Sequence, residues 1–285
     1  MDAAPRNWLS PTTRNDGGAS DRILVRSKLR DWLDDPDLAP DRWTVRDVLA
    51  PTVLVTAGTK HYSSRQLATD LATQLSSLQA SHPAAIRLLG GTALASEKPD
   101  LILQLSRVGE VAAARAHAVL TAGDGRTILW SGDFEQPTHN PANLRQQIAY
   151  TAAHVLRCAS EGLGSDDPLS HETLKTYLNA CAAMADDPAY DGRPVVRALE
   201  TVVGSSPGFV GGWAKLLQAE SYALTSPIVP AGPAAAPTLK RHIAAARRLE
   251  PELPEAYLAE YDLTHPSDFV GRGRLLDKVV ERNPN

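Results

Sequence analysis

Two cysteines and the histidines near them are the side chains whose types and spacing suit metal or redox chemistry. His154 and Cys158 are four residues apart, which places them on one face of a helix, and His171 and Cys181 follow. Thiolates and imidazoles in such a group can bind zinc, but structural zinc sites usually contain a Cys-x-x-Cys pair, and this sequence has none. We therefore expect no metal ion and no cofactor.

The same two cysteines favour a disulfide. Cys158 lies near the end of one predicted helix, Cys181 lies on the apolar face of the next, and 22 residues separate them. If the two helices are antiparallel, the positions differ by about 9 Å along the axis, an offset that the connecting loop can absorb. The bond would stabilise the fold by about 3 kcal/mol. The alternative is a pair of buried free thiols, which behave as small apolar side chains.

Motifs for enzymatic catalysis are weak. Residues 204–208 match the G-x-S-x-G string of a nucleophile elbow, but that motif needs a preceding strand, and here the pattern before it is helical. Phosphate-binding glycine loops and metalloprotease motifs do not occur in the sequence. Acidic pairs stand beside or just before prolines at predicted helix boundaries, where carboxylates serve as caps and turn residues: Asp34-Asp35, Asp166-Asp167 and Asp186-Asp187. We predict that the protein is not an enzyme.

Composition excludes further classes. The 285 residues carry 29 Lys+Arg against 33 Asp+Glu, a net charge of -4, and 43% of them are hydrophobic. This length suits two domains with real cores, and the acidic balance lacks the basic surface that nucleic-acid binding needs. No apolar run approaches the roughly 20 residues that span a bilayer. We expect the chain to bind no nucleic acid itself and to meet a membrane only through an upstream anchor.

The predicted secondary structure that must position the candidate side chains changes near residue 162, from strands and helices to helices alone. Before it, β-branched and alternating runs predict strands at residues 52–56, 85–89, 101–107, 111–120 and 127–135. Helices are predicted around Leu67, Leu71, Leu75 and Leu78, and from Asn140-Pro141 to Gly162. After it, only helical patterns occur. The predicted fold is α+β, divided into a flexible tether (1–20), a short helix and linker (21–50), an α/β domain (51–162) and an all-α repeat domain (163–285).

The helical half repeats itself. Pro251 and Pro284 follow helix ends and are 33 residues apart, whereas Pro207 and Pro251 are 44 apart because residues 225–237 form a proline-rich insertion. Trp213 and Tyr257 lie at matching places after the first two turns. A period near 34 is typical of tetratricopeptide repeats, in which helical hairpins stack because none can cover its own apolar face.

A leucine-spaced helix followed by an antiparallel meander links this sequence to a known family. Residues 67–75 form the helix, residues 100–107 and 111–120 form two strands, and residues 124–131 end the meander with Trp130-Ser131. In this order they resemble the TolB-amino-terminal-like domain that precedes tetratricopeptide repeats in bacterial membrane-anchored regulators. The architecture is also similar to the periplasmic region of CadC-type transcriptional regulators, an α/β part followed by a helical part with a disulfide.

The resemblance implies a periplasmic sensory or interaction module, joined through the tether to a membrane helix and a DNA-binding domain that are missing upstream. We expect a protein or peptide partner, or a homodimer, on the repeat surface, at residues Trp213, Lys215, Tyr222, Arg241 and Tyr257. For the aromatic residues among them, packing between helices is the alternative. A second hypothesis is a pH or small-ligand sensor near His139, His154 and His171, and a third is a scaffold of the cell envelope.

Overall fold

The computed structural model describes residues 51–58, 62–81, 87–89, 98–108, 113–137, 141–165, 169–186, 192–226, 232 and 234–282. Ala50–Asn285 form one compact unit, which is described here by itself. The predicted tether at residues 1–20 and the helix and linker at 21–50 lie outside the described residues.

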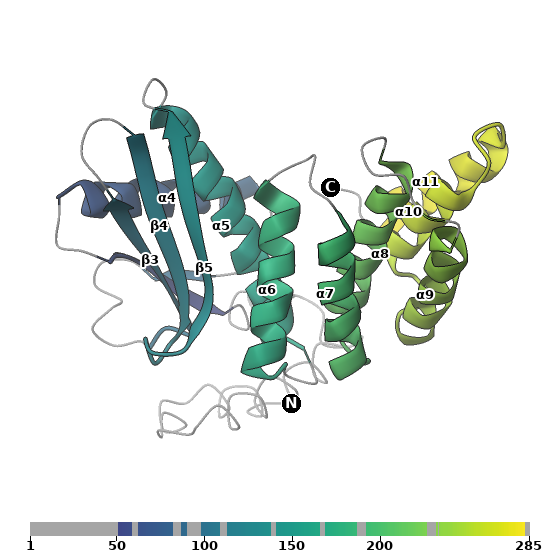
Figure 1. Ribbon diagram of the computed structural model, residues 1–285, viewed down its shortest axis with the longest axis horizontal. Helices are drawn as coiled ribbons and strands as arrows, with labels where there is room; N and C mark the ends of the chain where they lie inside the picture. Colours follow the sequence, from purple (N-terminus) through teal and green to yellow (C-terminus); the bar gives the residue numbers. More distant parts are fainter. Residues whose placement is uncertain are drawn as a thin grey trace, which may run out of the picture. The chain divides into compact units, whose positions relative to one another are not determined.

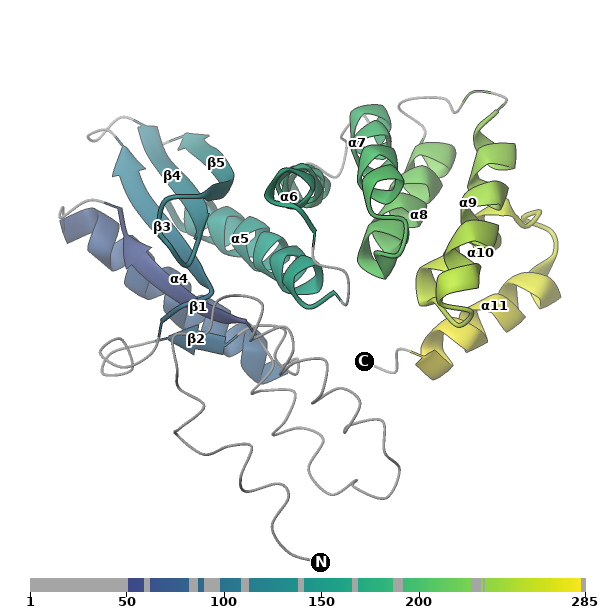
Figure 2. The same ribbon diagram turned by 90° about the horizontal axis from the view of Figure 1, so that it is seen from below.

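Five strands form one mixed sheet in the order β2-β1-β3-β4-β5 (Figures 1 and 2). The β-branched run of β1 (Thr52–Ala57) pairs in parallel with β2 (Arg87–Leu89) and β3 (Leu101–Val108). β3, β4 (Ala113–Ala122) and β5 (Ile128–Pro137) pair antiparallel. The sheet therefore combines a parallel start with the antiparallel meander.

The turn between β4 and β5 is held by Asp124. Its carboxylate accepts hydrogen bonds from the backbone N–H groups of Arg126 (2.8 Å) and Thr127 (3.0 Å) and from the Thr127 hydroxyl (2.9 Å). These bonds favour the ionised form and lower the pKa of Asp124 to about 2. Gly125 follows at φ 68°, a left-handed conformation that glycine adopts without strain.

Helices α4 (Tyr62–Ser81) and α5 (Pro141–Leu163) cover one face of the sheet (Figure 2). From Leu101 to Leu105 of β3, every second side chain is buried, and the leucine stripe of α4 is buried with it. The buried leucines are Leu101, Leu103 and Leu105 on β3 and Leu67, Leu71 and Leu75 on α4. The burial confirms the stripe predicted for α4 at these three positions, and the side chain of Leu78 is outside the described set.

Beyond β5, the described chain is helical: α5 is followed by α6 (His171–Asp186), α7 (Gly192–Ser205), α8 (Val210–Thr225), α9 (Ala235–Leu249), α10 (Pro254–Leu263) and α11 (Phe269–Arg282). The α+β class is therefore confirmed. Both views place α6 between α5 and α7, and α6 also contacts β5 (Figures 1 and 2). No helix in the described ranges is both long and apolar enough to cross a membrane.

The buried side chains form two clusters. The larger one runs from the sheet through α5, α6 and α7 as far as Leu216 and Ala219 of α8. The smaller one lies among α8, α9 and α10, around Leu217 and Ile243. Trp213 packs against both clusters. The α/β part thus shares its core with the first helices of the helical part, which makes their junction a packed interface.

Candidate functional site

A disulfide and a polar stripe share one face of α5. Arg157, Cys158 and Glu161 lie three, four and seven residues after His154, so their side chains share one side of the helix. Cys158 is bonded to Cys181 of α6, with the two Cα atoms 6.7 Å apart. Because the bond uses both sulfur atoms, neither cysteine is a thiolate that could bind a metal beside His154.

Tyr177 of α6 meets this stripe one turn away from the disulfide. Its phenol donates a hydrogen bond to Glu161 Oε2 at 2.6 Å and lies 3.3 Å from the carbonyl oxygen of Gly211 on α8. The side chain is fully buried. Burial, and after it the negative charge of Glu161, raises the pKa of the phenol well above its ordinary value. Tyr177 therefore stays protonated and acts as a donor at neutral pH.

Lys215 of α8 points into the same region. The residue is only 7% exposed, and its Nζ lies 3.5 Å from Gln218 Oε1. Burial lowers the pKa of Lys215, while the neighbouring Glu161 carboxylate acts in the opposite direction. A buried ammonium is costly unless a counter-charge lies near it, and Glu161 supplies negative charge here.

His154 carries the unsatisfied nitrogen of the stripe. Its Nε2 is buried and has no hydrogen-bond partner among the described residues. Burial is the main cause that lowers the pKa of His154 from 6.5 to about 4, and the positive charges of Lys215 and Arg157 act in the same direction. The imidazole is therefore neutral at pH 7.

Small residues at the start of α8 allow this close packing. A Cβ atom placed on Gly211 would lie 2.8 Å from the ring of Phe209 and 3.3 Å from the Tyr177 hydroxyl. The rings of Phe209 and Tyr177 meet edge to face, with centroids 5.0 Å apart. Glycine at position 211 thus lets the α8 backbone come within reach of the phenol.

We call His154, Arg157, Glu161, Tyr177 and Lys215 the interhelical polar cluster. At neutral pH it combines a neutral imidazole, a protonated phenol, a carboxylate and two basic side chains. Protonation of His154 is disfavoured in this cluster, since an added proton would place a further positive charge beside Lys215 and Arg157. The cluster joins α5, α6 and α8, so a change in its charge acts on the packing between the α/β part and the helical part.

Of the five residues that the sequence suggests for partner binding, two are buried. Lys215 belongs to the interhelical polar cluster, and Tyr257 is 4% exposed, with its hydroxyl 3.1 Å from Glu252 Oε2. The guanidinium of Arg247 lies over the Tyr257 ring, 4.7 Å from its centroid. Tyr257 therefore serves packing between helices in this structure.

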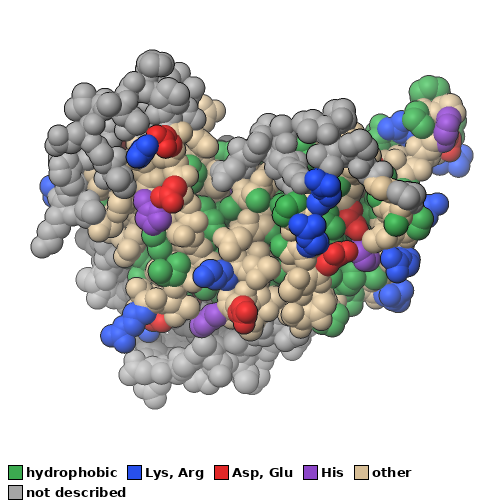
Figure 3. All heavy atoms as spheres, in the orientation of Figure 1, with side chains coloured by type: hydrophobic (Ala, Val, Ile, Leu, Met, Phe, Trp, Pro, Cys, Tyr) green, Lys and Arg blue, Asp and Glu red, His purple; other side chains and the backbone are tan. Residues whose placement is uncertain are grey.

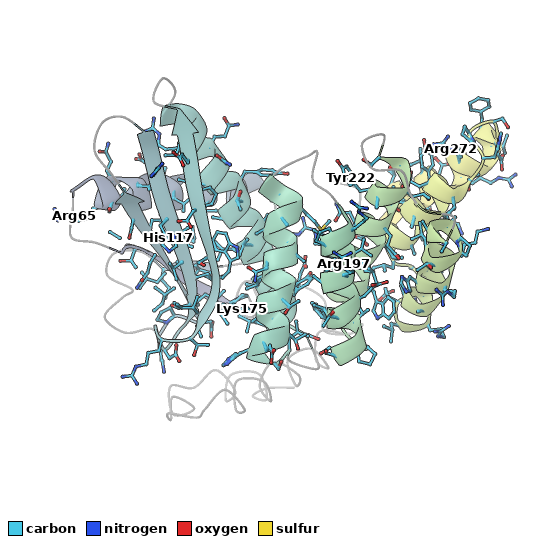
Figure 4. The ribbon with its side chains drawn as sticks, viewed as in Figure 1. Arg65, His117, Lys175, Arg197, Tyr222 and Arg272 are labelled. Carbon is cyan, nitrogen blue, oxygen red and sulfur yellow. A yellow bond between two sulfur atoms is a disulfide. The ribbon has the colours of Figure 1, made fainter. Side chains whose placement is uncertain are left out.

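The other three suggested residues are partly or fully exposed. Trp213 is half-buried, and its Nε1 donates to the carbonyl oxygen of Pro207 at 2.8 Å. Tyr222 is partly exposed near the carboxyl end of α8, where Figure 4 labels it. Arg241 is exposed on α9 and donates to Thr238 Oγ1 at 3.1 Å. Of these five residues, only Lys215 belongs to the interhelical polar cluster.

The histidines suggested for a sensor do not form one group among the described residues. His154 is in the interhelical polar cluster, His171 is exposed at the start of α6, and His139 lies outside the described residues. Sequence reasoning missed Arg157, Glu161 and Tyr177. The spacing of polar residues on α5, beside its apolar face, was the one signal that could have found the first two.

A separate apolar surface lies on α11, which we call the α11 stripe. It consists of Phe269 (80% exposed), Val270 (66%), Leu276 (40%) and Val280 (63%). Figure 3 shows hydrophobic side chains at the surface of this end of the described chain. Large apolar side chains gathered on one exposed helix are typical of a contact surface.

No protein-family model matches the chain, and no curated protein matches it either.

Proposed function

We propose that this chain is a non-enzymatic sensory and protein-interaction module, built from a TolB-amino-terminal-like domain and tetratricopeptide-like helical pairs, that associates with a second copy of itself through the α11 stripe. We further propose that it is the periplasmic part of a membrane-anchored bacterial transcriptional regulator. The exposed apolar side chains of α11 are the observation that carries the interaction role.

Matching positions in successive helical pairs support the repeat assignment. α8 and α10 begin three residues after Pro207 and Pro251, and Trp213 and Tyr257 each lie six residues after the corresponding proline. α8 packs against both α9 and α10, and α10 packs against α11. In stacked helical hairpins the first helices of neighbouring pairs lie side by side in this way.

The orientation of α11 leaves its stripe turned away from α10. Arg272 lies over the ring of Tyr261, 3.9 Å from its centroid, and Lys278 lies 5.0 Å from the centroid of the Tyr257 ring. These cation–π contacts hold one side of α11 against α10. Figure 4 labels Arg272 on α11. Phe269 and Val280, which are far more exposed, are available to a partner.

The charges beside the stripe favour a second copy as the occupant. Arg274, in the first half of α11, and Asp277 and Glu281, in the second half, are all exposed. If two copies of α11 pack antiparallel, Arg274 of each copy faces the acidic residues of the other. A two-fold contact of this kind uses the same surface twice. One helix per subunit buries little area, so we expect a weak, concentration-dependent dimer.

Sedimentation velocity over a range of protein concentrations tests the dimer. We expect the wild-type chain to dimerise and the double variant Phe269→Ser/Val280→Ser to stay monomeric, because both side chains are exposed and their loss should not disturb folding. The matched control is Ile128→Ser, which removes an apolar side chain that is 53% exposed on β5. A wild-type chain that stays monomeric, or a double variant that still dimerises, contradicts the proposal.

A charge-exchange pair tests the antiparallel arrangement. Arg274→Glu should weaken the dimer by placing like charges opposite each other, and Arg274→Glu combined with Glu281→Arg should restore it. Equal dimerisation of all three proteins would rule out this arrangement.

The disulfide supports the proposed compartment. Disulfides persist in oxidising environments such as the periplasm and are rare in the reducing cytosol, and Cys158 and Cys181 are joined. The expected measurement is protection of both thiols from alkylation in cells until a reductant is added. Free, reactive thiols in freshly lysed cells would contradict a periplasmic location.

The interhelical polar cluster favours a second candidate function, pH sensing at the junction of the α/β and helical parts. The charged and titratable groups around His154 are Arg157 and Glu161 on α5, Tyr177 on α6 and Lys215 on α8, with Glu255 of α10 acting on Tyr177 and Lys215. Acidification would place a positive charge on a buried imidazole next to two cations. An unchanged melting temperature and oligomeric state between pH 5 and 8 would exclude this function.

A further inference from the structure

Three successive helices bring together a histidine and two glutamates that are not part of the interhelical polar cluster. Glu200 lies on α7, Glu220 on α8 and His242 on α9. One potential ligand atom from each residue lies within 4.8 Å of the other two. Figure 4 labels Arg197 on α7, three residues before Glu200.

Glu220 is the buried member of this group. Its side chain is 8% exposed, and both carboxylate oxygens lie 2.9 Å from Nδ1 of His242. Removing a carboxylate from water is costly unless a cation or donors compensate. The nearby carboxylate of Glu200 adds a second negative charge, so a single imidazole does not balance the two.

The imidazole is held in position by its neighbour. The ring of Trp213 meets the ring of His242 edge to face, with centroids 5.8 Å apart. Fixing the ring of a ligating histidine is the usual role of the residues around a metal site. Glu200, by contrast, is exposed, and its side chain is free to move toward a bound ion. Figure 3 shows a histidine beside acidic side chains on the face formed by these helices.

We propose that Glu200, Glu220 and His242 bind a divalent transition-metal ion of the zinc type. Around tetrahedral zinc, ligand atoms about 2.0–2.1 Å from the ion lie roughly 3.3 Å from one another. The 2.9 Å between Glu220 and His242 and the limit of 4.8 Å for the whole group bracket that spacing. A modest side-chain movement of Glu200 therefore completes three protein ligands, and water can take the fourth position.

The ligand set selects among metals. Magnesium and calcium prefer six or more oxygen ligands, whereas an imidazole nitrogen with two carboxylates suits zinc and its neighbours in the first transition row. Because the ligands come from α7, α8 and α9, the ion would tie two successive helical pairs together. A ligand that binds only the folded chain stabilises it. This inference is independent of the proposed dimer and of the regulatory role.

Zinc titration of the untagged full chain, after treatment with a chelator, tests the site. We expect calorimetry to give one zinc ion per chain and thermal melting to show a higher Tm with zinc than without. Glu200→Gln should weaken binding by about tenfold or more, by analogy with the losses that follow changes around metal ligands. Its exposed position keeps the fold intact. His242→Ala should abolish binding at the same concentrations.

A second histidine–carboxylate pair provides the matched control. His117 Nδ1 lies 2.7 Å from Asp133 Oδ1 on the sheet, and no third metal-ligating residue joins them in the clusters found in the described chain. His117→Ala should therefore bind zinc like the wild type. No zinc binding by the wild type, unchanged binding by Glu200→Gln and His242→Ala, or preferential binding of magnesium or calcium would each overturn the proposal.

Discussion

His154 should make the stability of this protein fall as the pH falls from 7 to 5. Its imidazole is neutral in the folded chain because it is buried next to Lys215 and Arg157, which hold its pKa at about 4. In the unfolded chain the ordinary pKa of 6.5 applies. Between pH 4 and pH 6.5 the unfolded state binds more protons than the folded state, so acid favours unfolding.

The size of the effect follows from the two pKa values. The stabilisation is fully present above pH 6.5, decreases by at most about 1.4 kcal/mol per pH unit, and is lost as the pH falls through 4. Between pH 7 and 5 the loss of folding stability amounts to about 2 kcal/mol if solvent screening of the charges is neglected. Part of the side chain of His154 remains in contact with solvent, so we expect about 1 to 2 kcal/mol after screening.

Urea denaturation of the wild type and of His154→Gln at pH 7 and pH 5 measures the effect. Other titrating groups contribute to both proteins, so the difference between their pH dependences isolates His154. The wild type should lose about 1 to 2 kcal/mol more than the variant between the two pH values. His171→Gln, at an exposed position, is the control and should behave like the wild type. Identical pH dependence of the wild type and His154→Gln would refute the reasoning.

Three further changes probe the packing of α5 against α6 and the turn between β4 and β5. Replacing Cys158 and Cys181 by alanine should cost about 3 kcal/mol in urea denaturation, and thiol titration of the denatured, unreduced wild type should find no free thiol. Tyr177→Phe removes the 2.6 Å hydrogen bond to Glu161 and should cost about 1 to 2 kcal/mol; an unchanged denaturation midpoint would show that the bond contributes nothing. Gly123→Ala would force a Cβ atom onto the backbone carbonyl of Pro99 and should cost about 1 to 3 kcal/mol of folding stability. Thermal melting should show this cost as a lower Tm. A Tm equal to that of the wild type would mean that the turn shifts freely.

The helices and strands followed from local patterns. Alternation along residues 101–107 and the leucine spacing from Leu67 to Leu75 each determine which face of an element is apolar, and the structure buries those faces. The turn at residues 122–125 carries an equally local signal, because glycine and aspartate suit its geometry. These signals lie within a few residues of one another, so the sequence alone contains them.

The residues that the sequence suggests for partner binding were harder to place. Tyr257 and Lys215 lie on helices whose patterns were recognised, yet both side chains are turned inward, because the stacking of neighbouring helices decides which side of a helix is covered. The apolar residues of α11 are exposed for the same reason: one side of that helix packs on α10 and the other does not.

The sequence by itself determined the order of strands and helices, the change from mixed to helical structure and the two cysteines that could pair. Only the tertiary structure decided which charged groups meet. Tyr177 reaches Glu161 across 16 residues, and His242 reaches Glu220 across 22. Such contacts depend on the rotation and separation of packed helices, which the apolar periodicity of one helix does not specify. The same contacts decide how far the pKa values of His154, Tyr177 and Lys215 depart from their ordinary range, because those values depend on burial and on neighbouring charge.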